Sequence, residues 1–296
     1  MEDVARPRVH VTGAVPHEIA EALAASFEVA PTPAGVDGIL SLLTTRVDAP
    51  FLDGAGPGLR VVANYAVGVD NIDLEEVRRR GIVVANTPDV LTDATAELAI
   101  AAALALLRRV AEGDRFVRAR QPWSFSLEFM LGRSLRGARF LVVGPGRIGR
   151  ATGKLAEALG AVVSYAGSGD DLHARLAEAD VVSLHVPLRP ATRHLIDAAA
   201  LAAMRPEAVL VNTARGAVVD EAALVEALRT GRLAGAALDV YEREPEVPDA
   251  LLGLENVVLT PHLGSATRDT RIRMGMLAVS ALRDVLVEGR EPPNRV

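Results

Sequence analysis

The sequence predicts the α/β fold class, with two domains that each have a parallel sheet covered by helices. Its 296 residues are enough for two ordinary domains, and half of them are hydrophobic. Short runs rich in β-branched residues alternate with alanine-rich helical stretches, which is the pattern of βαβ units. The alternation occurs in two series, and the second begins at Arg139 after one long helical stretch.

The first series contains five short strand-like runs and one clear helix. The apolar runs are bounded by turn residues, as strands of a buried sheet are. Their ranges are 8–12, 27–29, 36–43, 59–64 and 82–85, and the helix covers 16–27. The basic run Arg78–Arg80 is expected to be the solvated C-terminus of a further helix, where positive charge complements the helix dipole.

A long helix over 93–118, with Thr92 as its N-cap, is expected between the two series. A loop with Pro122 and the sole tryptophan, Trp123, follows it. The second series predicts six strands, over 140–143, 161–165, 181–186, 209–212, 235–239 and 257–260. A final helix over 267–288 is expected to return to the first domain.

Composition and charge argue against several classes of function. The net charge of −6 disfavours non-specific nucleic-acid binding, which requires a cationic face. The absence of cysteine excludes disulfides, thiolate metal sites and a cysteine nucleophile, and no metal is expected. The longest apolar run, 98–107, is shorter than the roughly 20 residues that a membrane span needs. The expected location is therefore the cytoplasm, with neither membrane nor nucleic acid as a partner.

A predicted strand leads directly into the glycine motif Gly144-Pro-Gly146-Arg147-Ile148-Gly149, which a helical stretch follows. The first glycine permits a tight turn, the second lets the backbone approach a pyrophosphate, and the third lets the helix pack on the strand. The amides of Arg147 and Ile148 would face the phosphates. The motif alone is weak evidence, but its strand–turn–helix setting predicts a dinucleotide site.

Three residues each follow a predicted strand of the second series: Arg215, Glu244 and His262. Ligands of open parallel sheets bind at the carboxyl ends of the strands. Reduction of a 2-keto acid requires a cation for the carboxylate and the ketone, a proton donor, and a carboxylate that favours the protonated donor. Arginine, histidine and glutamate suit these roles in that order. Taken singly, Arg215 could instead form a salt bridge within its loop, Glu244 could be one of several exposed charges, and His262 could be a hydrogen-bonded loop histidine.

The motifs together resemble the D-isomer-specific 2-hydroxyacid dehydrogenases. In the second series they are GPGRIG, NTARGAVVDEAAL, LDVYEREP and LTPHLGSAT. In the first series, VANYAVGVDNID and GIVVANTPDVLTDATAEL are similar to the glyoxylate/hydroxypyruvate reductase branch. The resemblance covers nearly the whole chain in family order. It implies an NAD(P)-dependent oxidoreductase that reduces a small 2-keto acid, such as glyoxylate or hydroxypyruvate, to the 2-hydroxy acid.

The resemblance also implies roles for individual residues. Arg215 would bind the substrate, His262 would be the acid/base and Glu244 its partner. Backbone amides near Val67 and Gly68 would hold the substrate carboxylate. The nicotinamide end of the cofactor would be lined by Thr213, Ala214, Asp239, His262 and Gly264.

The family further implies a homodimer and two Rossmann-like domains with the active site in the cleft between them. The expected split is a flavodoxin-like substrate domain over 1–92 and 264–296 and a dinucleotide-binding domain over 93–263. Two segments of the family pattern are missing. Only residues 30–36 separate two strands of the first series where the family has a helix, although a parallel crossover normally needs a dozen residues. After Tyr165 the short edge strand and the loops around the adenosine are absent, so a compacted substrate domain and adenosine side are expected.

Cofactor choice depends on the end of the strand that finishes at Tyr165. NAD-specific folds place an acidic residue there for the ribose hydroxyl. Here the corresponding position is Gly167, followed by Ser168, which could donate a hydrogen bond to a 2′-phosphate. The sequence therefore slightly favours NADP over NAD. Asp170 and Asp171 follow closely, however, and either of them could restore a preference for NAD.

Two alternatives remain open. One is another dehydrogenase of the family, of the phosphoglycerate, phosphite or formate type, although formate-type enzymes resemble a Gln–His rather than a Glu–His pair. The other is a dinucleotide-sensing binding protein of the same fold, because such proteins can keep the Arg, Glu and His. Oxidation of NADPH or NADH in the presence of glyoxylate or hydroxypyruvate distinguishes an enzyme from a sensor.

Overall fold

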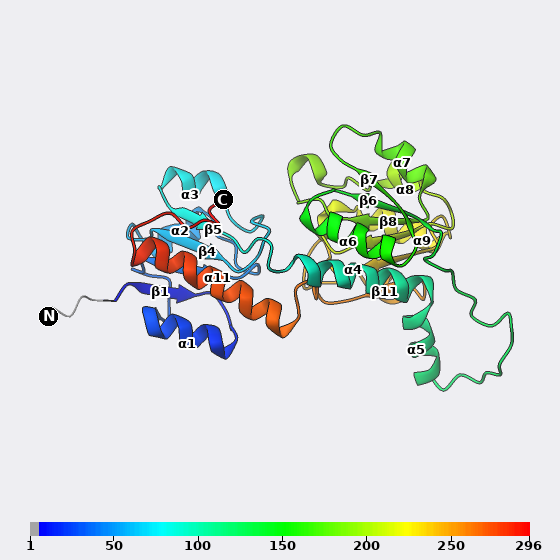
Figure 1. Cartoon of the computed structure of the whole chain (residues 1–296), viewed down its shortest axis with the longest axis horizontal. Helices are drawn as coiled ribbons and strands as arrows, with labels where there is room; N and C mark the ends of the chain where they lie inside the picture. Colours follow the sequence, from blue (N-terminus) through cyan, green and yellow to red (C-terminus); the bar gives the residue numbers. More distant parts are fainter. Residues whose placement is uncertain (1–5) are drawn as a thin grey trace. The chain divides into compact units, whose positions relative to one another are not determined.

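A computed structural model of the chain describes residues 6–296. The chain forms two compact units (Figure 1). The first contains the chain up to Leu91 together with Ala266–Val296, and the second contains Thr92–Ser265. The assignment of a substrate domain over 1–92 and 264–296 and a dinucleotide-binding domain over 93–263 stays a prediction. Residues 1–5 of the expected first domain lie outside the described residues.

The first unit is a five-stranded sheet in the order β2-β1-β3-β4-β5, and every neighbouring pair is parallel. Its strands are β1 (Arg8–Val11), β2 (Glu28–Ala30), β3 (Gly38–Ser41), β4 (Val61–Asn64) and β5 (Val83–Ala85). Its helices are α1 (His17–Ser26), α2 (Ala49–Ala55), α3 (Leu74–Arg79) and α11 (Arg268–Leu286).

Alternating strand residues explain why helices cover both faces of this sheet. Ile39 and Val62 pack with Leu52 of α2 on one face. Gly38 faces the other side, where a Cβ would lie 2.9 Å from the Leu286 side chain, so glycine lets α11 pack close to β3. The C-terminal helix therefore belongs to the first unit, as the sequence predicted. Within the described residues, no helix combines the length and the hydrophobicity that crossing a membrane would take.

The connection from β2 to β3 contains no helix, in agreement with the first deletion inferred from the sequence. Both strands pair with β1, and only residues 31–37 join them. β2 has three residues, which span roughly 10 Å, so seven residues suffice to return across it. The Gly35 amide donates to the Ala55 carbonyl at 2.9 Å and ties this short crossover to the end of α2.

The second unit is a six-stranded parallel sheet in the order β11-β10-β9-β8-β6-β7. Its strands are β6 (Arg139–Val143), β7 (Val162–Ala166), β8 (Val181–Leu184), β9 (Val209–Asn212), β10 (Gly235–Leu238) and β11 (Val257–Leu259). Its helices are α4 (Thr92–Leu107), α5 (Val110–Arg118), α6 (Arg147–Ala158), α7 (Leu172–Glu178), α8 (Ala198–Ala203), α9 (Glu221–Arg229) and α10 (Asp249–Leu252). Phe140 and Val142 pack with α4 and α6 on one face of the sheet, whereas Leu141 and Val143 pack with α7, α8 and α9 on the other.

The expected single helix over 93–118 is wrong, because the chain forms two helices there. Arg109 has a left-handed backbone (φ 55°) and separates α4 from α5. The Leu107 carbonyl accepts a hydrogen bond from the distant Arg133 amide at 2.8 Å, so a partner outside the helix takes the place of the next helical turn. Thr92 is the first residue of α4 and not the cap before it.

The second deletion leaves β7 at the edge of its sheet. Residues 167–171 lead from β7 directly into α7, and the chain then returns to β8 on the other side of β6. No strand lies beyond β7 among the described residues. The sheet therefore ends at β7, one strand beyond the strand that leads into the glycine turn, which fits the compaction expected from the sequence.

Candidate active site

The glycine motif forms the turn between β6 and α6. Gly144 has φ 95°, and a Cβ there would lie 2.8 Å from the His185 carbonyl carbon, so only glycine fits this turn. A Cβ on Gly149 would lie 2.3 Å from the Gly144 carbonyl oxygen, so the third glycine lets α6 pack against the turn. Beside Gly146, in contrast, no described atom lies within 4 Å of the place that a Cβ would take. α6 begins at Arg147, with Ile148 as its second residue, and this open space at its N-terminus suits a phosphate group.

The loop after β9 offers a second feature that fits a dinucleotide. The Thr213 hydroxyl is buried and has no hydrogen-bond partner within residues 6–296, a costly state that a ligand would relieve. The Ala214 amide donates to Asn212 Oδ1 at 3.0 Å and holds this loop in place. No group of three or more metal-ligating side chains occurs in the same described part of the chain. The open space beside Gly146 at the start of α6 and the buried Thr213 hydroxyl fit an NAD(P) cofactor.

A carboxylate stands at the end of β7. The Gly167 amide donates a hydrogen bond to Asp170 Oδ2 at 2.7 Å, and Gly167 also neighbours Pro145 of the glycine turn. Ser168 follows it in an exposed position. Asp171 instead caps α7 and accepts a hydrogen bond from the third residue of that helix at 3.1 Å. Of the two aspartates, Asp170 is therefore the one placed beside Gly167, where an NAD-specific fold has its acidic residue.

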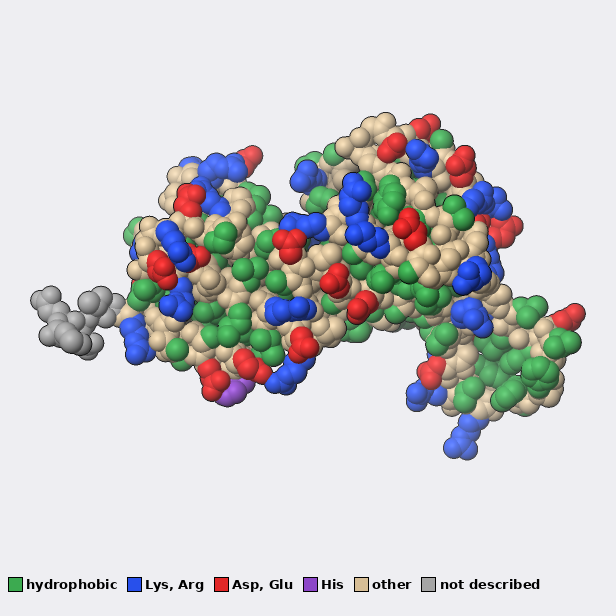
Figure 2. All heavy atoms as spheres, viewed as in Figure 1, with side chains coloured by type: hydrophobic (Ala, Val, Ile, Leu, Met, Phe, Trp, Pro, Cys, Tyr) green, Lys and Arg blue, Asp and Glu red, His purple; other side chains and the backbone are tan. Residues whose placement is uncertain are grey.

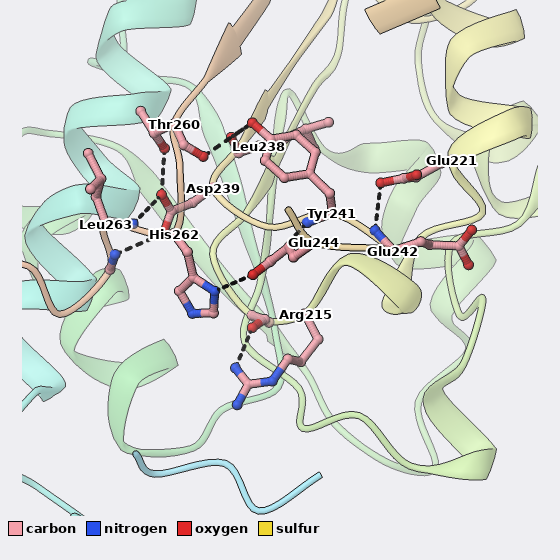
Figure 3. Close-up of polar contacts among 12 residues, drawn as sticks. Arg215, Glu221, Leu238, Asp239, Tyr241, Glu242, Glu244, Thr260, His262 and Leu263 are labelled. Atoms are coloured by element: carbon pink, nitrogen blue, oxygen red, sulfur yellow. Dashed lines mark hydrogen bonds and ion pairs between the residues drawn. The ribbon is translucent and has the colours of Figure 1, made fainter. Parts of the chain in front are cut away.

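The structure brings Glu244 and His262 together. His262 Nδ1 lies 2.7 Å from Glu244 Oε2, and each side chain is about one-third exposed. The other carboxylate oxygen of Glu244 accepts a hydrogen bond from the Tyr241 amide at 3.1 Å. Figure 3 shows that Arg215, Glu244 and His262 converge from three separate loops. The contact at Nδ1 fixes the ring and leaves Nε2 on the side opposite Glu244.

Asp239, the residue after β10, shapes the turn that presents His262 (Figure 3). Its buried carboxylate accepts hydrogen bonds from the Thr260 hydroxyl at 2.5 Å and from the Leu263 and Gly264 amides at 2.7 and 2.8 Å. The His262 amide donates to the Asp239 carbonyl at 2.9 Å, and His262 itself has a left-handed backbone with φ 55°. These bonds hold His262 in a conformation that a non-glycine residue seldom adopts.

Arg215 lies in the turn after β9. Asn212 Nδ2 donates to the Arg215 carbonyl at 2.9 Å, and the guanidinium donates to the preceding carbonyl at 2.8 Å. The next residue, Gly216, lies against the neighbouring turn, since a Cβ there would be 1.9 Å from the Tyr241 carbonyl carbon. Glycine at this position therefore lets the Arg215 turn pack directly on the turn that carries Glu244.

The surroundings keep Glu244 ionised. Burial acts to raise the pKa of Glu244, but the hydrogen bond and charge of His262, the Tyr241 amide and the charge of Arg215 together lower this pKa below its ordinary value. Glu244 is therefore an anion at neutral pH. A carboxylate in contact with a histidine favours the protonated ring, which is the form that can give up a proton.

Val67 and Gly68 belong to the first unit and lie in the loop after β4. Their carbonyls accept hydrogen bonds from Asn86 Nδ2 at 2.8 Å and from Asn64 Nδ2 at 2.7 Å. Neither asparagine was predicted from the sequence as a functional residue. The sequence does contain one signal that could have pointed to Asn64. It is an amide side chain in an otherwise apolar buried strand, and such a side chain must find hydrogen-bond partners.

A glycine turn suited to a dinucleotide, together with an arginine and a His–Glu pair at the carboxyl ends of parallel strands, defines an NAD(P)-dependent dehydrogenase. Residues 100–264 match the family model described as D-isomer specific 2-hydroxyacid dehydrogenase, NAD binding domain. The chain is 43% identical to a glyoxylate reductase of Aeropyrum pernix, over 98% of this chain and 96% of that one. It is 45% identical to a glyoxylate reductase of Thermococcus litoralis, over 88% and 83% of the two chains.

Solved structures match nearly the whole chain. A protein from Thermus thermophilus matches with a TM-score of 0.91 and 46% identity, over 98% of this chain and 99% of that one. The NADPH-dependent glyoxylate/hydroxypyruvate reductase of Sinorhizobium meliloti, in complex with NADP and malonate, matches with a TM-score of 0.88 and 36% identity, over 99% and 97% of the two chains. The chain therefore belongs to the D-isomer-specific 2-hydroxyacid dehydrogenases. It is an NAD(P)-dependent enzyme that reduces a 2-keto acid.

Proposed function

We propose that this enzyme reduces glyoxylate or hydroxypyruvate to the corresponding 2-hydroxy acid. The observation that carries the proposal is the 2.7 Å contact between His262 Nδ1 and Glu244 Oε2, on a turn that packs directly against the Arg215 loop. The two glyoxylate reductases named above, at 43% and 45% identity, support the choice of a small 2-keto acid.

Each requirement of the reaction is met by a residue of this chain. The Arg215 guanidinium binds the substrate carboxylate and polarises the ketone oxygen, a contact that suits its planar fork of donors. Amides of the first-unit loop at Val67 and Gly68 are further candidates for contact with a substrate carboxylate. His262, protonated and held by Glu244, gives its proton to the ketone oxygen. Bound NAD(P)H supplies the hydride to the carbonyl carbon.

The cofactor is held at three places. The glycine turn and the first amides of α6 would hold its pyrophosphate, and the end of β7 would hold its adenosine ribose. A carboxylate at that end disfavours a 2′-phosphate, so Asp170 weighs against the NADP preference expected from Gly167 and Ser168. The residues proposed to contact the cofactor are Gly144, Gly146, Arg147, Ile148 and Gly149 at the pyrophosphate, Gly167 and Ser168 at the ribose, and Thr213, Ala214, Asp239, His262 and Gly264 at the nicotinamide.

The direct test follows nicotinamide absorbance with glyoxylate in the wild type and in His262→Ala. Loss of a general acid is expected to lower kcat by about 10²–10⁴-fold, and cofactor binding, measured by titration calorimetry, should weaken far less because most of the cofactor contacts remain. His17→Ala is the matched control, because His17 lies on α1 with a side chain that is 82% exposed. A wild type that oxidises neither NADH nor NADPH with glyoxylate or hydroxypyruvate contradicts the proposal. A His262→Ala enzyme within about twofold of the wild type removes His262 from the mechanism.

We further propose that the enzyme is a homodimer and works in the cytoplasm, where reduced cofactor is regenerated. Residues 119–133, here called the arm, follow α5 and carry several exposed apolar side chains. They are Trp123, Phe125, Leu127, Phe129 and Leu131. Figure 2 shows hydrophobic side chains gathered over this part of the second unit. Exposed apolar patches mark interaction sites, and a two-fold dimer would cover the same patch on both copies.

A further inference from the structure

Two successive backbone carbonyls of the loop after β4 are held by asparagine side chains. Asn86 Nδ2 donates to the Val67 carbonyl at 2.8 Å, and Asn64 Nδ2 donates to the Gly68 carbonyl at 2.7 Å. The two asparagines come from different strands of the sheet: Asn64 ends β4 and Asn86 directly follows β5. The loop is therefore tied at both carbonyls to the sheet beneath it.

Tying a carbonyl also fixes the direction of an amide. A trans peptide is planar, and its N–H points opposite to its C=O. The Val67 carbonyl shares a peptide with the Gly68 amide, and the Gly68 carbonyl shares a peptide with the Val69 amide. Both amides therefore point away from the asparagines, and neither donates a hydrogen bond within residues 6–296. Two oriented amides without partners form a binding place for an anion.

Asn64 is locked in this orientation by buried neighbours. Both Asn64 and Ser41 are fully buried. The Ser41 hydroxyl donates to Asn64 Oδ1 at 2.9 Å, and Asn71 Nδ2 donates to the same oxygen at 3.1 Å. With its oxygen engaged on one side, the Asn64 amide nitrogen is left facing the Gly68 carbonyl.

Asn86 is held by the last residues of the chain. The Asn86 amide donates to the Asn294 carbonyl at 3.1 Å, and the Asn294 side chain donates in return to the Asn86 carbonyl. The Val296 amide donates to the Val84 carbonyl at 2.9 Å, so the C-terminal segment pairs with the end of β5. A chain of contacts thus runs from Asn294 through Asn86 to the Val67 carbonyl.

We propose that Asn86 and Asn294 are positioning residues that orient the Gly68 amide toward the carboxylate of the 2-keto acid. This proposal rests on the proposed function above. It adds an explanation of how a backbone amide that binds the substrate is held in its orientation. Asn86 acts on the Val67 peptide, and Asn294 acts only through Asn86. Hydrogen bonds from oriented amides to a carboxylate are charge-assisted, so a change in their direction weakens substrate binding more than it disturbs the fold.

The test compares Asn86→Ala, Asn294→Ala and the double variant, with Asn256→Ala as the control. Asn256 lies in the second unit and its side chain bonds only at 3.3 and 3.5 Å. Asn86→Ala is expected to raise KM for glyoxylate about tenfold, with kcat within about twofold and KM for the cofactor unchanged, as for the loss of one charge-assisted hydrogen bond. Asn294→Ala is expected to give a smaller rise. Because the two residues act in series, the double variant should equal Asn86→Ala.

A second readout separates substrate binding from folding. The affinity of oxalate for the enzyme saturated with NADH, measured by calorimetry, should fall by the same factor as KM rises. If Asn86→Ala does not fold, Asn86→Leu carries the test, because it keeps about the size of the side chain and removes the donor without adding a charge near the substrate carboxylate. An active wild type with unchanged KM and oxalate affinity in the Asn86 variants overturns this inference and leaves the proposed function standing. Rises in KM that multiply in the double variant overturn the link through Asn294. A wild type without turnover contradicts the proposed function itself.

Discussion

At the residue scale, the reaction depends on the charge of Glu244 at its contact with His262. The lowered pKa of Glu244 keeps this carboxylate ionised throughout the neutral range. In Glu244→Gln a neutral side chain of the same shape replaces the carboxylate that faces His262 Nδ1. We expect kcat/KM for reduction at neutral pH to fall about tenfold, which corresponds to about 1.4 kcal/mol of lost attraction. A kcat/KM within about twofold of the wild type contradicts the pairing.

The lowered pKa of Glu244 also predicts how the stability of the fold changes with pH. A carboxyl whose pKa is lower in the folded chain than in the unfolded one stabilises the fold above its unfolded pKa. That contribution is lost as the pH falls through the lower folded value. Glu244 thus contributes to stability at neutral pH and ceases to do so in acid.

Asp170 is the residue on which cofactor choice is expected to depend. Its carboxylate accepts the Gly167 amide at 2.7 Å at the end of β7, where it would repel a 2′-phosphate. Asp170→Ala is expected to raise the ratio of kcat/KM with NADPH to kcat/KM with NADH about tenfold, or about 1.4 kcal/mol.

Asp171→Ala is the matched control for this change. Asp171 caps α7, so its loss should cost about 1 kcal/mol of stability and leave the cofactor ratio alone. If the ratio is the same in Asp170→Ala and in the wild type, Asp170 has no part in cofactor choice.

At the scale of elements, the site depends on two turns that touch through a single glycine. A Cβ on Gly216 would lie 1.9 Å from the carbonyl carbon and 2.1 Å from the carbonyl oxygen of Tyr241, and backbone atoms cannot move aside cheaply. Gly216→Ala is therefore expected to push the Arg215 turn away from the Glu244 turn. We expect a loss of about 1–3 kcal/mol of stability and at least about a tenfold drop in kcat/KM.

Gly54→Ala provides the comparison for the glycine change. Gly54 lies in α2 with no described atom within 4 Å of a Cβ, and alanine favours a helix. Thermal unfolding and glyoxylate kinetics should be unchanged or slightly improved in this control. Wild-type kinetics in Gly216→Ala would show that the contact between the two turns is not needed.

At the scale of the whole molecule, the arm over 119–133 carries five exposed large hydrophobic side chains within nine positions. Phe125 and Leu127 are 84% and 83% exposed. The rings of Trp123 and Phe129 stack with centroids 6.4 Å apart, so part of this surface is already ordered in the single chain. The double change of Phe125 and Leu127 to Ser is expected to convert a homodimer to monomers in light scattering after gel filtration.

Leu252→Ser is the control for the arm, because Leu252 is also exposed, at 60%, but lies on α10. A wild type that is monomeric at micromolar concentration contradicts the homodimer. A wild-type dimer that survives the double change places the interface elsewhere.

Local features of the sequence determined the fold class and most of the elements. Strands and helices follow from apolar periodicity and from turn residues, both of which act over a few positions. The glycine motif is local at Gly149, where a Cβ would meet the Gly144 carbonyl of the same turn, whereas the contact that excludes a side chain at Gly144 comes from His185 after β8. The sequence predicted that Arg215, Glu244 and His262 lie at one edge of one sheet. Each of them follows a strand, and parallel strands end together.

Tertiary structure alone decided which distant groups meet. α4 ends where Arg133, 26 residues further on, takes the Leu107 carbonyl, so no helical periodicity could show the break. Asp170 rather than Asp171 faces Gly167 because Asp171 is needed as the cap of α7. The link from Asn294 to Asn86 spans 208 positions. Such contacts depend on how sheets and loops pack in space, and the spacing of residues along the chain carries no record of them.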